Sequence, residues 1–272
     1  MKQMNKRWLF VGVGVVSAAL LAAPQITSAA AAGGASSSQQ KTDVVPDTGQ
    51  TLFKAFSTGA DGGTTYRIST TGNVFSAESP SGFEHIEAGT FQEGYILCYT
   101  PQGGSQVNAY DDDLNQFGFG AATDTAGPPV AVTRKTSDNK MQLKQVYTFN
   151  AQSKSLKIVM SVKNLTSSTA SGVIIRRAVD FDIDSNFFND WGRTLDSAFA
   201  WNDTTGHGMN LQHVAGPSHT AKVFAAFYPD DCTPTSDATP LSGTDGVASI
   251  DYNLGNIAAG ATKSATVQYT RI

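Results

Sequence analysis

The sequence predicts an all-β protein, a large antiparallel β-sandwich, and three observations lead to this fold class. After residue 50, short apolar segments recur at close intervals, separated by Gly, Ser, Thr, Asn and Asp. Many of these segments alternate apolar and polar side chains, which is the period of a half-buried strand, and almost none has the period of a helix. Two of the longest are separated by the five residues Asn150–Lys154, a length that suits a β-hairpin.

The first 30 residues have the order of a secretory signal peptide. Lys2, Lys6 and Arg7 precede an uncharged apolar run over Trp8–Ala23, and small residues end the segment. The run is about 16 residues long, which is short for a transmembrane helix of roughly 20 residues. We therefore expect residues 1–30 to be cleaved, which leaves no stable membrane span and makes the protein secreted or periplasmic.

The remaining chain divides by composition. Residues 31–50 are rich in Gly, Ser, Gln and Pro and contain few apolar residues, which is typical of a flexible lead-in. Residues 51–272 contain no internal repeat and no clear linker, and all-β domains of this size are common. We therefore expect a single β-sandwich domain over residues 51–272.

Twelve segments of the domain are expected to be strands. In chain order they are Leu52–Phe56, Thr64–Thr70, Gly94–Thr100, Gln106–Tyr110, Val130–Lys135, Met141–Phe149, Ser155–Lys163, Gly172–Ile183, Thr194–Trp201, Lys222–Tyr228, Val247–Tyr252 and Thr262–Thr270. Their length and number are similar to those of the galactose-mutarotase-like supersandwich. This resemblance implies a large sandwich and assigns no role to any residue.

The chain contains two cysteines, Cys98 and Cys232. In an exported protein, the simple expectation is one disulfide between them. The alternative is two unpaired thiols, because Cys98 lies in an apolar segment that fits a protein core.

The net charge of the chain limits the classes of molecule that it is expected to bind. The signal peptide holds three of the 19 basic residues and none of the 23 acidic residues, so the mature chain carries a net charge of −7. An acidic surface argues against nucleic acid and anionic membranes, both of which need basic patches. Neutral polymers and cations remain as partners, or the charge serves solubility alone.

The expected strand Gly172–Ile183 carries the strongest functional signal, because side chains alternate between the two faces of a strand. One face is apolar, and the other carries Arg176, Asp180, Asp182 and Asp184. Same-face residues two apart lie roughly 6.5–7 Å from each other, so the carboxylates must be solvated, paired with arginine or bridged by a cation. A solvated outer face, a binding or catalytic face and a calcium site all fit this pattern.

A calcium site, the one cofactor that the sequence raises, would lie where this strand ends. The spacing of its acids does not fit an EF-hand, because Ser185 replaces the required Gly and Trp191 replaces the bidentate Glu. A set of oxygen ligands from Asp184, Asn186 and Asp190, with Asn189 beside them, remains open.

Aromatic residues follow the expected strand Gly172–Ile183. Phe187, Phe188 and Trp191 come directly after it, and Trp201 ends the next expected strand. Rings beside carboxylates and amides suit sugar recognition, because a ring stacks on the apolar face of a pyranose while polar groups bind its hydroxyls. The alternative is that these rings only close the end of the sandwich.

Other common sites are not expected. His207, His213 and His219 lie in a Gly-rich region that would interrupt a strand, and the chain has no HExxH motif. His85 lies beside Glu84 and Glu87, so an acid/base role is open, but a surface loop is the favoured expectation. The sequence also lacks the serine-hydrolase elbow, the phosphate loop and the dinucleotide fingerprint.

Three functions follow from these features. The leading expectation is a secreted non-catalytic module that binds carbohydrate or another cell-surface polymer. Its binding residues would be Arg176, Asp180, Asp182, Asp184, Trp191 and Trp201. The alternatives are a glycan-active enzyme (an epimerase, lyase or hydrolase) that uses Asp180 or Asp182 as acid/base, and a structural envelope protein.

Overall fold

The computed structural model describes residues 51–57, 62–86, 93–112, 115–127, 129–225, 231–234 and 236–272. The expected signal peptide and lead-in, residues 1–50, lie outside the described residues, and both stay predictions. Within the described ranges, no helix is long and apolar enough to cross a lipid bilayer.

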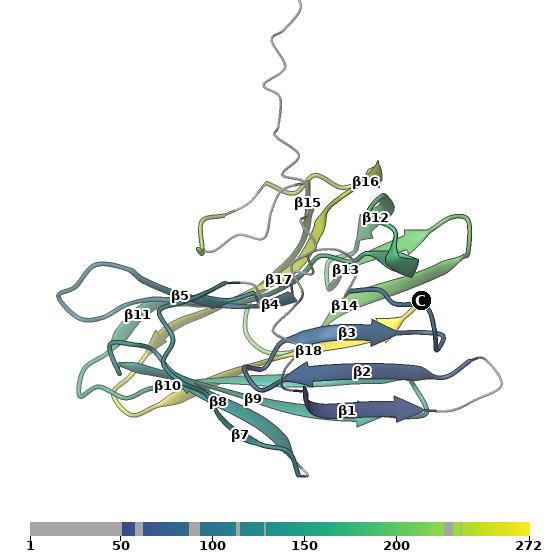
Figure 1. The fold of residues 1–272 in the computed structure, drawn as a ribbon. Helices are drawn as coiled ribbons and strands as arrows, with labels where there is room; N and C mark the ends of the chain where they lie inside the picture. Colours follow the sequence, from purple (N-terminus) through teal and green to yellow (C-terminus); the bar gives the residue numbers. More distant parts are fainter. Residues whose placement is uncertain are drawn as a thin grey trace, which may run out of the picture. The chain divides into compact units, whose positions relative to one another are not determined.

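The described chain forms antiparallel strands in three sheets, which confirms the predicted all-β antiparallel sandwich (Figure 1). The small sheet has the order β1 (Thr51–Ser57), β2 (Thr64–Ser69), β3 (Val74–Glu78). The nine-stranded sheet has the order β16 (Leu241–Thr244), β12 (Asn189–Arg193), β13 (Ser197–Asn202), β14 (His207–Ala215), β18 (Thr262–Arg271), β10 (Ser155–Asn164), β9 (Met141–Asn150), β8 (Val130–Lys135), β7 (Thr123–Thr125). The six-stranded sheet has the order β15 (His219–Phe224), β17 (Val247–Ile257), β11 (Ala170–Val179), β4 (Glu93–Thr100), β5 (Val107–Asp111), β6 (Gln116–Phe117).

The predicted hairpin is β9–β10, which lies within the nine-stranded sheet. Its register places Leu143 opposite Val162 and Tyr147 opposite Ile158, and all four side chains are buried. The last strand, β18, pairs with the other edge of β10, so the end of the chain lies inside the sheet. The predicted hairpin is therefore confirmed, and its alternating pattern places one face of each strand in the core.

One apolar core joins the three sheets. Its buried side chains come from the small sheet (Tyr66, Ile68, Val74), the nine-stranded sheet (Leu156, Ile158, Met160, Val267, Tyr269) and the six-stranded sheet (Leu97, Val173, Ile175, Ile250). The inward face of each strand packs against the inward faces of the other sheets, as in other sandwiches.

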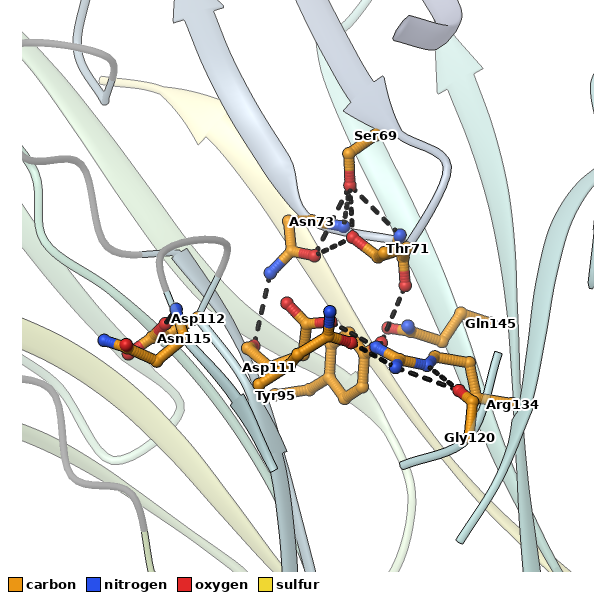
Figure 2. A network of polar contacts seen from close by, with 12 residues as sticks. Ser69, Thr71, Asn73, Tyr95, Asp111, Asp112, Asn115, Gly120, Arg134 and Gln145 are labelled. Carbon is orange, nitrogen blue, oxygen red and sulfur yellow. Dashed lines mark hydrogen bonds and ion pairs between the residues drawn. The ribbon is translucent and has the colours of Figure 1, made fainter. Parts of the chain in front are cut away.

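Charged and polar side chains also lie in this interior, and Figure 2 shows one such network. The guanidinium of Arg134 contacts the carboxylate of Asp111 and donates to Gln116 Oε1 at 2.6 Å. The hydroxyl of Tyr95 donates to the carbonyl of Thr71 at 2.7 Å, which holds the β2–β3 turn on strand β4. These contacts fix loops to the sheets rather than forming an open site.

Within the described residues, the strands differ from the predictions in two ways: β11 is shorter than expected, and six strands are not among the expected ones (β3, β6, β7, β12, β14 and β16). Strand β11 ends at Val179, four residues before the predicted end, and the short 3₁₀ turn η1 (Ile183–Ser185) follows it. Asp184 and Ser185 both have positive φ (59° each), which is unfavourable for residues other than glycine in a regular strand. Strand β14 was not predicted, because its Gly and His residues hide the apolar alternation.

Candidate functional site

Arg176 does not lie on a solvated outer face. Its side chain is 1% exposed and lies under the segment 231–234. The guanidinium donates to Asp251 at 2.7 and 2.9 Å, and to the carbonyl oxygens of Asp231 and Thr233 at 2.9 and 3.2 Å. The face that the sequence predicts to be open is therefore covered by a loop from a distant part of the chain.

The same segment carries the disulfide. Cys98 and Cys232 are bonded, with 6.1 Å between their Cα atoms, so the predicted bridge is confirmed. Around it lies a second small apolar cluster on this face of the six-stranded sheet, made of Ile96, Ala178, Phe224 and Val247. Arg176 and the disulfide together fasten the segment 231–234 to the sheet.

Asp180, Asp182 and Trp191 are also buried, with side chains 3%, 0% and 0% exposed. The expectation that Asp180 and Asp182 lie on an exposed strand face, with Trp191 at its edge, is wrong, because β11 ends at Val179 and the chain then turns. The indole of Trp191 instead packs in the core, with its ring 6.2 Å from that of Phe181. None of these three side chains is accessible to a large ligand at the protein surface.

Asp184 forms a cluster with two histidines. Its backbone N–H donates to Nδ1 of His85 at 3.1 Å, and its carboxylate Oδ1 lies 2.7 Å from Nδ1 of His207. Nε2 of His85 lies 2.6 Å from the carbonyl oxygen of Ser79. The ring of Phe83, which is 42% exposed, lies edge-on to His207 with 4.6 Å between the centroids.

His85 is buried, so the expectation of a surface loop is wrong. Its Nδ1 accepts a hydrogen bond and its Nε2 faces a carbonyl oxygen, so the neutral Nε2–H tautomer fits both contacts. Burial lowers the pKa of His85, although Ser79 and the charge of Asp184 act in the opposite direction. Burial, and then the neighbouring His219, also lowers the pKa of His213, whose ring stacks on His219 at 3.7 Å.

The protein is expected to lose stability as the pH falls below about 6.5, the ordinary pKa of histidine. The folded-state pKa of His85 is lower than the unfolded value, so the unfolded state binds the proton more readily. The stabilisation is complete above the unfolded pKa and is lost as the pH falls towards the folded pKa. Thermal melts from pH 7.5 to 5.0 should show a smaller loss for His85→Gln than for wild type. An equal or larger loss in the variant would contradict this role.

The residues of the expected calcium site have separate local contacts. The carboxylate of Asp184 contacts Nδ1 of His207. Asn186 closes a turn, with Oδ1 accepting from the N–H of Phe188 at 3.2 Å. Oδ1 of Asp190 accepts from the N–H of Gly243 at 3.0 Å, and a hydrogen bond from Ser242 is the main cause that lowers the pKa of Asp190.

Trp201 lies on an aromatic surface at the outer face of β13. Ala198 and Ala200 point into the core, so the alternate residues Phe199 and Trp201 point outward, and both are half-buried. Their rings lie 5.8 Å apart at 37°. Gly192 lies opposite Phe199 in the strand register. A Cβ at this position would lie 2.7 Å from the Phe199 ring, so only glycine leaves room for the ring to pack against the backbone of β12. We call Phe199 and Trp201 the aromatic platform.

Polar groups border the aromatic platform. Asp190 lies opposite Trp201 in the strand register, and Asn210 lies opposite Phe199 on the other side. Asp203 Oδ1 accepts a hydrogen bond from Nε1 of Trp201 at 2.6 Å, which fixes the indole ring. The alternation of apolar and polar positions in Ser197–Asn202 predicts that Phe199 and Trp201 share one face. The sequence analysis names Trp201 as a binding residue and does not name Phe199.

The chain matches no protein-family model and no curated protein sequence. Its fold is similar to part of a bacterial glucoamylase complexed with acarbose, with a TM-score of 0.56 and 8% identity over 82% of this chain. The chain spans only 32% of that glucoamylase. A putative aldose 1-epimerase from Escherichia coli K12 matches 80% of this chain and 99% of its own length, with a TM-score of 0.46 and 10% identity. At these identities the likeness to the glucoamylase concerns the fold alone.

Proposed function

We propose that this protein is an extracellular, non-catalytic module that binds neutral carbohydrate on the aromatic platform. The observation that carries the proposal is the outward pair of Phe199 and Trp201, bordered by carboxylates and an amide. Half-buried rings on the outer face of a sheet leave apolar area in contact with solvent, and a stacked sugar would cover that area.

The chemistry of the platform suits a pyranose. The rings offer flat apolar faces to the C–H face of a sugar, and Asp190 and Asp203 offer acceptors for its hydroxyl groups. The net negative charge of the mature chain favours an uncharged glycan over an anionic one. A ring pair fixed by Gly192 and Asp203 also loses little side-chain entropy on binding.

Two further observations support this proposal. The glucoamylase with the similar fold is described in complex with acarbose, although that binding belongs to a much longer protein. The disulfide supports an oxidising compartment, where exported glycan-binding proteins act.

Replacing Trp201 with Ala is expected to weaken glycan binding about tenfold or more, because central aromatic anchors contribute about 2 kcal/mol or more. Affinity electrophoresis in gels that contain soluble neutral polysaccharides measures the change. Phe199→Ala should weaken binding in the same way. Phe117→Ala is the matched control, because Phe117 is an aromatic residue 63% exposed on β6, in the other large sheet. Equal retardation of Trp201→Ala and wild type would contradict the proposal.

A second candidate is a glycan-active enzyme, and one specific observation favours it. His207 is partly exposed and held at 2.7 Å by Asp184, an arrangement that suits a general base. Asp180 and Asp182 are buried and do not suit that role. If the protein is an enzyme, incubation with the bound glycan releases a product or inverts a centre, and His207→Gln abolishes the change. A structural envelope protein would neither bind nor change any glycan.

A further inference from the structure

We propose that Asp180, Asp182 and Asp245, together with Asn189, bind one Ca²⁺ ion. One carboxylate oxygen from each aspartate lies within 4.8 Å of the other two. Calcium binds oxygen at about 2.3–2.6 Å, so two of its ligands are at most about 5 Å apart. The three oxygens therefore fit around one ion. This site is distinct from the set of Asp184, Asn186 and Asp190 that the sequence suggests.

Asn189 supplies the independent observation. Its side chain is buried, and its Nδ2 donates to the carbonyl oxygens of Phe181 at 3.0 Å and Asn186 at 2.6 Å. These two acceptors fix the orientation of the amide, because the opposite orientation would place oxygen against oxygen. Oδ1 is then a buried acceptor that no donor within the described ranges reaches. Buried amide oxygens nearly always have a partner, so this one indicates a ligand.

The contacts of Asn189 connect it to both chain segments that carry the acids. The carbonyl that accepts from its amide belongs to Phe181, the residue between Asp180 and Asp182. The backbone of Asn189 pairs with Thr244, the residue before Asp245. Asn189 therefore contacts the segment that carries two of the aspartates through its amide, and the strand that leads to the third through its backbone.

The donor set determines the class of ion. Three carboxylates and an amide oxygen are hard ligands, which favour Ca²⁺ or Mg²⁺ over Zn²⁺ or Cu²⁺. Calcium accepts the irregular geometry of ligands from three separate segments, whereas Mg²⁺ requires a near-ideal octahedron of shorter bonds. Crowded carboxylates that repel one another in the folded chain would be stabilised by a divalent ion.

Trp191 provides an optical reporter for this site. Its Nε1 donates to the carbonyl of Thr244 at 3.0 Å, and a Cβ on Gly246 would lie 3.0 Å from its ring. The indole therefore contacts both neighbours of Asp245. A Tb³⁺ ion, which takes the place of Ca²⁺ among oxygen ligands, would emit when this indole is excited.

The experiment titrates the full chain with Tb³⁺, with excitation of tryptophan, and then displaces the ion with Ca²⁺. We expect saturable emission that Ca²⁺ removes at concentrations at least tenfold lower than Mg²⁺. Calcium should also raise the melting temperature of the protein, and a chelator should lower it. Equal displacement by Mg²⁺ would overturn the assignment to calcium, and absence of both emission and thermal shift would overturn the site.

The variants separate the site from general charge effects. Asp245→Asn changes an exposed residue, so the variant should fold and yet bind Tb³⁺ at least tenfold more weakly. Asp124→Asn, which removes an exposed acid on β7, is the control and should bind as wild type does. Equal emission from Asp245→Asn and Asp124→Asn would contradict the proposal. No glycan is present in this experiment, so its outcome is independent of the proposed carbohydrate binding.

Discussion

Replacing Arg177 with Met is expected to lower the free energy of unfolding by about 3–5 kcal/mol, as does the loss of one partner of a buried ion pair. Arg177 and Glu93 are both fully buried, and the guanidinium donates to both carboxylate oxygens at 2.6 and 2.7 Å. Burial opposes the charge of Arg177, but the adjacent Glu93 carboxylate raises its pKa well above the ordinary value. The variant leaves a carboxylate in the core without its counter-charge.

Urea denaturation followed by circular dichroism measures this loss. The matched control is Arg193→Met, because Arg193 pairs with Asp237 while its side chain is 36% exposed. Exposed pairs contribute at most about 1 kcal/mol, so the control should change stability little. The double variant with Glu93→Gln should recover part of the loss, since no buried charge then remains. Equal losses for Arg177→Met and Arg193→Met would contradict the account of the core.

Removing the disulfide is expected to have a similarly large effect. Cys98 and Cys232 are 134 residues apart, and a loop of this length is worth about 5 kcal/mol on the chain-entropy estimate. The double variant Cys98→Ala/Cys232→Ala should lose about 3–5 kcal/mol in the same urea experiment. Wild type treated with reductant under the same conditions should lose a similar amount. A loss below about 1 kcal/mol would show that Arg176 and the apolar cluster hold the segment 231–234 without the bond.

Local patterns were sufficient to predict the fold class. The alternation in Met141–Phe149 and Ser155–Lys163, with five residues between them, predicts the hairpin, because a hairpin depends on neighbouring residues. The two cysteines predict the disulfide, because no third cysteine competes. Strand β14 was missed since its Gly and His residues carry little strand signal, although pairing with β13 and β18 stabilises it.

The site could not be predicted to the same degree, because it depends on contacts between distant segments. Arg176 appears exposed from strand alternation alone, and nothing near it in the sequence shows that residues 231–234 cover it. In the same way, Asp245 is more than 60 residues from Asp180 and Asp182, so the acidic group does not appear in any local motif. The shared outward face of Phe199 and Trp201 can be predicted from the sequence, because both residues lie two apart in a single strand.

The most direct test of carbohydrate binding on the platform is an NMR titration of the tryptophan indole N–H groups with a neutral oligosaccharide. Trp201 lies on the platform and Trp191 lies in the core, so one spectrum contains both the probe and its internal control. The Trp201→Phe variant assigns the signal. We expect a saturable shift of the Trp201 resonance while that of Trp191 stays in place. A glycan that binds without moving the Trp201 resonance would contradict the account.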